Sequence, residues 1–159
     1  MSKKELNVSA IQNGTVIDHI AQGQVERVLY ILNLSKYEDQ IYFGSNLDSE
    51  KYGKKGIIKV SNKFFAPEEI NKIALISPTA TVIEIRDYEV TKKEQVQIPN
   101  QIKGFVKCMN PNCITNHEQV PTYFEVVSAP LNDRTLSEVE MLKCRYCEKN
   151  TGKANIEFI

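Results

Sequence analysis

The sequence predicts an α+β fold in two parts: a larger first part with two helices on an antiparallel sheet, and a small β-rich second part. Two observations lead to this expectation. Apolar residues alternate at strand spacing or recur at helical spacing through residues 5–90, and all four cysteines lie in two close pairs near the end. A chain of 159 residues can hold two such domains, which we expect over residues 1–98 and 99–159.

The first strand is expected over residues 5–12, because apolar side chains alternate there with polar ones. Asn13-Gly14 is a turn dipeptide, and residues 15–20 form a short extended segment after it. A helix is expected over residues 21–34, where apolar residues recur at the spacing of one helical face. The apolar positions of this face are Val25, Val28, Leu29 and Leu32.

Two strands are expected at residues 40–46 and 56–61, joined by a polar stretch that suits a hairpin with a long loop. Pro67 then opens a second helix, because proline is tolerated at the first helical position and the acidic residues behind it favour the positive end of the helix dipole. Pro78 follows the end of this helix. A β-branched run predicts the last strand, over residues 80–90.

In chain order these elements are strand, helix, strand, strand, helix, strand, the split βαβ order of the ferredoxin-like fold. We therefore expect an antiparallel sheet with both helices on one face. The polar residues 91–103 are expected to link the two parts. Short strand patterns in the second part fall at residues 105–106, 123–127, Leu142 and 156–159.

The four cysteines stand in the pattern Cys108-x4-Cys113 and Cys144-x2-Cys147. Two such hooks offer four soft thiolate ligands to an ion that prefers tetrahedral sulfur coordination, so the pattern predicts one structural Zn²⁺. A catalytic zinc keeps a position open for water, which four cysteines would fill. The metal should supply much of the folding free energy of the second part, on the order of 10 kcal/mol in model zinc peptides.

Other interpretations of the cysteines are weaker. Two disulfides would suit a secreted chain, but no apolar signal segment follows Met1, so we expect a cytoplasmic protein. A redox pair at Cys144 and Cys147 would need a βαβ pattern around it, and none is evident. His117 could replace one sulfur, but four cysteines already complete the shell and we leave it out.

Charge is balanced, with 20 basic and 20 acidic side chains, which argues against a dominant surface for nucleic acid. No run of 18 apolar residues predicts a membrane span. A zinc-ribbon nucleic-acid-binding protein remains the alternative function, supported by the cysteines and the basic residues near them. Against it stands the absence of tryptophan and of a basic stripe interleaved with aromatic residues.

Three segments of the first part indicate a nucleotide site. Residues 14–19 place a glycine turn beside polar side chains, Lys55 and Lys59 lie around one strand start, and residues 88–90 precede Lys92 and Lys93. Lysines bind phosphates as point charges, and backbone at strand ends can hydrogen-bond a base edge. Each feature taken alone is also common on an ordinary protein surface.

The same segments, in this order, closely resemble the regulatory chains of aspartate carbamoyltransferase. The resemblance covers nearly the whole chain and rests on residues 14–19, 57–60, 80–82, 88–90, 112–114 and 144–149. It implies a non-catalytic subunit in pyrimidine biosynthesis that binds ATP as activator and CTP as inhibitor, with UTP acting beside CTP in some members. It also implies a homodimer formed by the first part, a zinc-bound second part docked on the catalytic chain, and no nucleic-acid or membrane partner.

Carried over to matching positions, the resemblance implies which residues meet the effector. Backbone groups of Ala10, Ile11 and Tyr88 would contact the base, and Asp18 with Lys59 would approach the ribose. Basic side chains would contact the phosphates and valines would wall the pocket. These residues are His19, Lys55, Lys59 and Lys93 for the phosphates, and Val8, Val16 and Val90 for the walls.

Two features depart from the family pattern. The 30 residues between Cys113 and Cys144 exceed the length expected for familiar members, and we place the extra length around residues 128–141. Glu5 stands where familiar members carry a lysine, although Lys4 is adjacent. The resemblance therefore does not extend to catalytic-chain contacts in the longer segment or to a second nucleotide bound beside the first.

Overall fold

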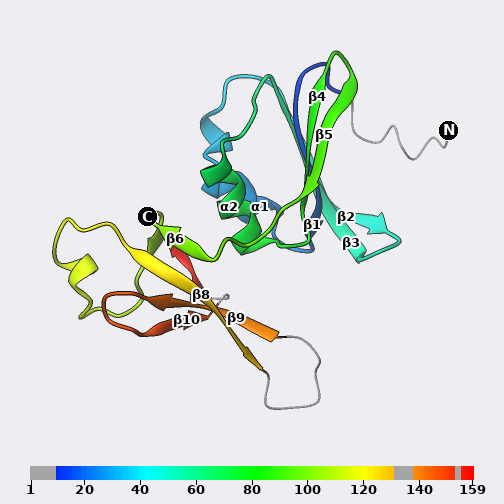
Figure 1. Ribbon diagram of the computed structural model, residues 1–159. Helices are drawn as coiled ribbons and strands as arrows, with labels where there is room; N and C mark the ends of the chain where they lie inside the picture. The colour runs from blue at the N-terminus through cyan, green and yellow to red at the C-terminus, as the bar shows by residue number, and fades with distance from the viewer. Residues whose placement is uncertain (1–9, 131–137, 153–154) are drawn as a thin grey trace. The chain divides into compact units, whose positions relative to one another are not determined.

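The computed structural model describes residues 10–130, 138–152 and 155–159, and it divides after Gln97 into two compact units. The first unit carries a five-stranded antiparallel sheet with helices α1 (Val25–Ile31) and α2 (Pro67–Ile76) on one side of it (Figure 1). The second unit carries a four-stranded sheet and a separate strand pair. The expected α+β class is confirmed.

The strand order of the first unit is β2-β3-β1-β4-β5, and every neighbouring pair is antiparallel. The first four strands, with α1 after β1 and α2 after β3, have the ferredoxin-like arrangement predicted from the sequence. Strand β5 extends the sheet beyond β4. The strands are β1 (Gly14–Ala21), β2 (Ile41–Ser49), β3 (Gly53–Ser61), β4 (Thr81–Arg86) and β5 (Glu89–Gln95).

The core of this unit lies between the sheet and the two helices. Ile17 pairs with Ile58 on one side and Val82 on the other, and all three side chains are buried. Residues paired across antiparallel strands share a face, so this row defines the helix-covered face. Gly56 lies on the same face, where an added Cβ would overlap the side chain of Val25 from α1.

The strand predicted over residues 5–12 is wrong in its described part, residues 10–12. Residues 10–13 are not in a strand, residues 5–9 lie outside the described part of the chain, and the segment expected to be short is the body of β1. The turn dipeptide misled the prediction, because Gly14 begins the strand and lies against β3. Its φ is 143°, and the Asn13 carbonyl accepts a hydrogen bond from Asn62 at 2.8 Å.

We expect Gly14→Ala to destabilise the first unit by about 3 kcal/mol, because the added Cβ would overlap the Val60 carbonyl oxygen at a φ that disfavours L side chains. Urea unfolding followed by circular dichroism measures the loss. Gly53→Ala is the matched control, since Gly53 also has a positive φ, 78°, but an added Cβ meets nothing within 4 Å. Equal losses in the two variants would exclude the overlap as the cause.

Helix α1 is shorter than expected, seven residues at Val25–Ile31. At its start, Ile20 and Ala21 still pair with β3, and Gly23 with φ 81° makes the turn into the helix. At its end, Asn33 with φ 55° turns the chain into the 3₁₀ turn η2 (Leu34–Lys36). Strand pairing before the helix and residues with positive φ at both ends therefore make the helix shorter than the apolar spacing of the sequence predicts.

Two further boundaries differ from the prediction. The strand expected over residues 80–90 is broken by a tight turn at Asp87 and Tyr88, whose φ values are 51° and 66°. The linker expected over residues 91–103 contains most of β5 and all of β6 (Gln101–Lys103). Strand β5 is exposed at every residue and so carries no alternating apolar pattern.

The second unit builds a small core around two sheets, including the buried side chains of Ile102, Val106, Phe124 and Leu142. All four predicted strand patterns overlap observed strands, whereas β6 and β10 were not predicted. Residues 131–137, within the segment of extra length, lie outside the described residues. The four-stranded sheet has the order β10-β9-β8-β6 and β11 pairs with β7: β7 (Val106–Lys107), β8 (Tyr123–Pro130), β9 (Glu138–Cys144), β10 (Asn150–Gly152) and β11 (Glu157–Phe158).

Candidate metal centre and open sheet face

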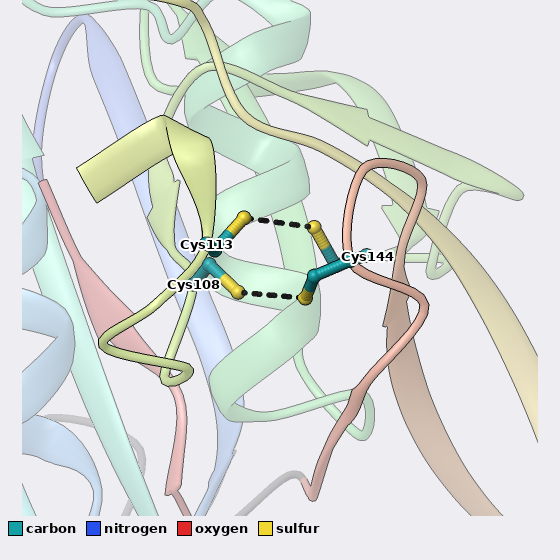
Figure 2. Close-up of side chains that lie close together, drawn as sticks. Cys108, Cys113 and Cys144 are labelled. Atoms are coloured by element: carbon teal, nitrogen blue, oxygen red, sulfur yellow. Dashed lines mark hydrogen bonds between the residues drawn. The ribbon is translucent and has the colours of Figure 1, made fainter. Parts of the chain in front are cut away.

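The four cysteines come together in the second unit (Figure 2). Their sulfur atoms all lie within 4.8 Å of one another, with Cys108 Sγ 3.6 Å from Cys147 Sγ and Cys113 Sγ 3.7 Å from Cys144 Sγ. Zn–S bonds of about 2.3 Å in a tetrahedron place sulfurs about 3.8 Å apart. The four thiols are free. The donor set therefore fits one zinc ion, as the sequence predicts.

Each pair of cysteines sits where a strand gives way to a tight turn. Cys108 follows β7, Cys113 precedes the 3₁₀ turn η3 (Ile114–Asn116), and Cys144 ends β9. Cys147 lies in the turn after β9 and is the only one of the four that is not fully buried. His117 lies outside this cluster, and its Nε2 is 2.8 Å from the Pro111 carbonyl oxygen.

The thiols have unequal proton affinities. Burial raises the pKa of Cys108 to about 12 and also raises the pKa of Cys144. Burial also acts to raise the pKa of Cys147, but hydrogen bonds from the Asn110 side chain, the Lys149 backbone and neighbouring thiols bring it to about 7. Cysteines bind metal as thiolates, so binding of the ion releases the thiol protons. The positive charge of the ion then offsets part of the negative charge of the buried thiolates.

The face of the five-stranded sheet opposite the helices carries several residues of the predicted effector site. Val16 of β1 pairs with Lys59 of β3 and with Ile83 of β4, and Ile83 pairs with Lys93 of β5. The row of residues through Val16 is adjacent in sequence to the buried row through Ile17. Because side chains alternate between the two faces of a strand, the Val16 row lies on the face opposite the helices. We call this surface the open face. Lys59 and Lys93 stand three strands apart, about 14 Å between backbones.

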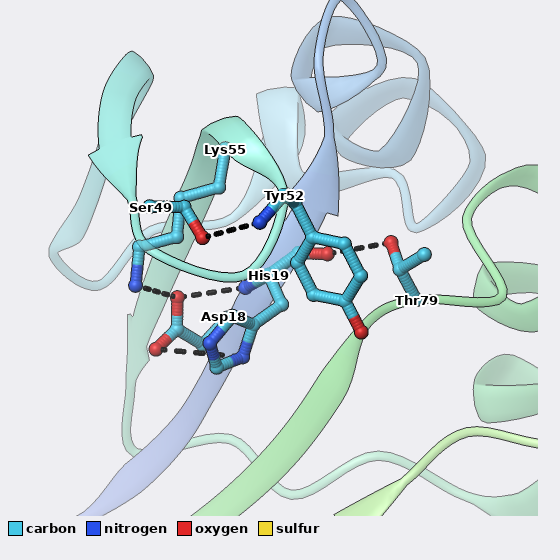
Figure 3. Close-up of polar contacts among 6 residues, drawn as sticks. All are labelled: Asp18, His19, Ser49, Tyr52, Lys55 and Thr79. Atoms are coloured by element: carbon cyan, nitrogen blue, oxygen red, sulfur yellow. Dashed lines mark hydrogen bonds and ion pairs between the residues drawn. The ribbon is translucent and has the colours of Figure 1, made fainter.

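A β-bulge in β1 brings Asp18 and His19 together. The register puts both residues opposite the single residue Ile57, and His19 has a φ of 56°. The His19 amide donates to Asp18 Oδ1 at 2.7 Å, and Thr79 Oγ1 donates to the His19 carbonyl at 2.8 Å. Neighbouring strand residues normally point to opposite faces, but the extra residue re-aims one of them. Figure 3 shows the two side chains next to each other.

Charged side chains gather around this bulge. Lys55 Nζ lies 2.8 Å from Asp18 Oδ1, and the side chains are only 20% and 18% exposed. Burial lowers the pKa of Lys59, while the negative charge of Asp18 acts in the opposite direction. A desolvated ammonium group gains from any further anion placed beside it. The bulge therefore holds a half-buried cluster with more positive than negative side chains.

Tyr52 is a contact that the sequence reasoning missed. It lies in the turn between β2 and β3, and its ring meets the His19 ring edge-on with centroids 5.8 Å apart (Figure 3). Lys51 Nζ stands 5.3 Å from the centre of the Tyr52 ring. Tyr52 and Thr79 lie in two separate turns that are far from the bulge in sequence. No local sequence pattern therefore links either residue to His19.

The remaining predicted residues lie toward the Gly14 end of the sheet. The turn at residues 87–88 contacts the segment before β1, because the Tyr88 amide donates to the Gln12 carbonyl at 2.9 Å. Tyr88 and Val90 are more than half exposed, Ala10 is exposed and Ile11 is buried. Val8 lies outside the described residues. The structure thus groups Asp18, His19 and Lys55 directly, with Tyr88, Val90 and Lys93 farther away.

The fold and the sites define a class of protein: a ferredoxin-like unit with a charged open face, joined to a small unit built on four metal-binding thiols. Residues 6–97 match the family described as aspartate carbamoyltransferase regulatory chain, allosteric domain, and residues 100–157 match the metal binding domain of the same chain. The chain therefore belongs to the family of aspartate carbamoyltransferase regulatory chains. It is a regulatory subunit and not a catalytic one.

Curated relatives that carry the same description cover almost the full length. The chain is 44% identical over 158 residues to the regulatory chain of Bacteroides thetaiotaomicron, covering 99% of this chain and 98% of the relative. It is 47% identical over 155 residues to that of Pyrococcus horikoshii, covering 96% of each. It is 50% identical over 147 residues to that of Thermococcus sibiricus, covering 92% of this chain and 91% of the relative. Among the described residues, no helix has the length and apolar character needed to cross a membrane.

Proposed function

We propose that this subunit senses nucleotides on the open face of its first unit and controls a catalytic chain of aspartate carbamoyltransferase. ATP activates and CTP inhibits, and UTP is a further candidate effector of the same site. The observation that carries the proposal is the half-buried basic cluster at the β1 bulge, where Lys55 and Lys59 surround one carboxylate, Asp18. Two lysines against one carboxylate leave a net positive charge for a triphosphate, and the His19 imidazole offers a further hydrogen-bonding group.

The length of the face supports a definite orientation for the nucleotide. From Gly14 to Asp18 the strand rises about 14 Å, with the apolar and exposed Tyr88 and Val90 at the Gly14 end and the basic cluster at the other. The base belongs at the first end and the phosphates at the second. The proposed site comprises Val8, Ala10, Ile11, Val16, Asp18, His19, Lys55, Lys59, Tyr88, Val90 and Lys93.

The second unit offers an apolar surface for the catalytic chain. Met109, Ile114 and Tyr146 are between 41% and 47% exposed, and each directly follows or lies between two metal-binding cysteines in the sequence. Large exposed apolar side chains on a rigid support are typical of protein interfaces. The metal would hold these side chains in fixed positions, so docking would depend on the loaded site.

An apolar groove in the first unit supports pairing with a second copy. It has a volume of about 340 Å³ beside the edge strand β2, and Tyr30 and Phe43 on it are 78% and 59% exposed. The edge strand also presents unpaired backbone groups. The lining includes Leu29, Tyr30, Leu34, Ile41 and Phe43. We propose a homodimer through this edge.

Regulation follows from linkage. A nucleotide shifts the catalytic chains between two states only by the difference in its affinity for those states, about 1 to 3 kcal/mol in known couplings. Asp18, His19, Lys55 and Lys93 come from three strands, so a change in the sheet would alter their spacing and with it the affinity. ATP and CTP would differ in the spacing that they favour.

Two neighbouring lysines of β5 provide the test, because they lie on opposite faces. Lys93 is on the open face, and Lys92 is on the helix side, paired with Glu84 and 3.2 Å from Glu94. Titration calorimetry of the zinc-loaded chain with CTP and ATP should give one competitive site per chain. Lys93→Ala should weaken binding roughly fivefold, as expected for one exposed phosphate contact, and Lys92→Ala should not. Absence of binding, or an equal effect of Lys92→Ala, would contradict the proposal.

A further inference from the structure

The first metal hook, Cys108 to Cys113, is held together by one side chain that follows it. Asn116 Nδ2 donates to the Cys108 carbonyl at 3.0 Å and to the Asn110 carbonyl at 2.7 Å. The Asn116 backbone amide donates to the Cys113 carbonyl at 2.9 Å. One residue therefore contacts the start, the middle and the end of the hook.

Asn110, in the middle of this hook, connects the two hooks. Its backbone amide hydrogen-bonds the Cys108 sulfur, and its side chain hydrogen-bonds the Cys147 sulfur in the second hook. Its Oδ1 also accepts from the Asn112 amide at 3.1 Å. Asn116 binds the Asn110 carbonyl and so holds Asn110 in place. Asn110 in turn donates to one sulfur of each hook, those of Cys108 and Cys147.

The two hooks differ in what closes them. The second hook has two residues between its cysteines and is closed by its own backbone, with the Cys144 amide donating to Lys149 and the Glu148 amide donating to Cys144. The first hook has four residues between its cysteines, and its backbone makes one bond inside the hook, from the Cys113 amide to Asn110. A longer loop has more conformations to lose when it binds metal, and side-chain hydrogen bonds reduce that loss.

We propose that Asn116 is a positioning residue of the metal centre: its amide closes the longer hook and holds Asn110 against the sulfurs, which slows loss of the ion. Asn116 touches no sulfur itself. Retention of the metal through Asn116 is independent of the proposed effector site. The ligand pattern in the sequence does not reveal this role of a residue after Cys113.

Zinc release from the full-length chain to a chromophoric chelator in excess tests this inference. Asn116→Ala should release zinc about tenfold faster, at the lower end of the effect of losing outer-shell partners because Asn116 is exposed. Asn116→Asp should behave like Asn116→Ala, since a carboxylate cannot donate to the two carbonyl oxygens. Both variants should still bind one zinc per chain at saturation, because all four sulfurs remain.

Two matched variants separate positioning from general loss of stability. Asn112→Ala alters the same hook at an exposed side chain, and should release zinc at the parent rate. Thr122→Ala removes a buried 2.6 Å hydrogen bond to the Val106 carbonyl in the same unit, and should accelerate release less than Asn116→Ala. Parent-like release from Asn116→Ala, or equal acceleration by Thr122→Ala, would overturn the inference.

Discussion

Cys144→Ser is expected to unfold the second unit while the first unit stays folded. Cys144 is fully buried at the end of β9, and the variant leaves three sulfurs for an ion that structural sites bind with four ligands. Zinc contributes on the order of 10 kcal/mol to folding in model peptides, which is comparable to the whole stability of a typical domain. The core of a unit of 62 residues cannot replace a contribution of that size.

Zinc content and an amide NMR spectrum measure this prediction together. Zinc should fall well below one ion per chain, and the amide signals of the second unit should collapse to random-coil positions. His117→Ala is the control, because His117 follows the first hook but lies outside the sulfur cluster, and this variant should keep its zinc. A Cys144→Ser chain that keeps one tightly bound zinc and a dispersed spectrum would contradict the structural role of the site.

Lys59→Ala is expected to abolish the nucleotide response of the complex reconstituted with its catalytic chain, while assembly stays intact. Lys59 lies on the open face beside Val16, and burial lowers its pKa, so a phosphate placed beside it would favour its charged form. Removing it should cost about 2 kcal/mol of effector binding, the scale of a partly buried charge-assisted hydrogen bond. A contact that Lys59 makes in one state only is itself an affinity difference between the states, so its loss removes the coupling that drives the response.

The response is the ratio of carbamoyl-transfer rates with and without CTP or ATP. Lys54→Ala is the matched control, because Lys54 precedes Lys55 on β3 but pairs with the exposed Asp48 at 2.6 Å. This control should respond like the parent. Gel filtration should show the same complex for all three proteins. An undiminished response to CTP or ATP in Lys59→Ala would exclude Lys59 from the effector site.

Patterns with a short range were sufficient to predict the metal centre and the ferredoxin-like order of two helices and four strands in the first unit. The cysteine spacing predicts four ligands wherever the two hooks meet, and the fold has only to bring β7 and β9 close. The β-branched run of β4 and the proline at the start of α2 also act locally. Each of these features depends on a few neighbouring residues, so the sequence contains the needed information.

The features missed from the sequence depend on contacts between distant segments. Gly14 resembles a turn residue until β3 is known to lie against it, and β5 carries no apolar alternation because it is exposed throughout. The bulge that turns Asp18 and His19 to one side is a register effect, and Tyr52 reaches it from another hairpin. The role of Asn116 likewise could not be predicted, because it depends on the contact between Asn110 and Cys147 in the folded chain.

An amide NMR titration of the zinc-loaded chain with CTP and with ATP locates the effector site residue by residue. We predict that both nucleotides shift the signals of residues along β1 and β3 on the open face, chiefly Asp18, His19 and Lys59, and leave the signals of α2 nearly unchanged. Shifts confined to the helix side, around Ile70 and Val96, or no shifts at saturating nucleotide, would contradict the claim that the open face is the effector site.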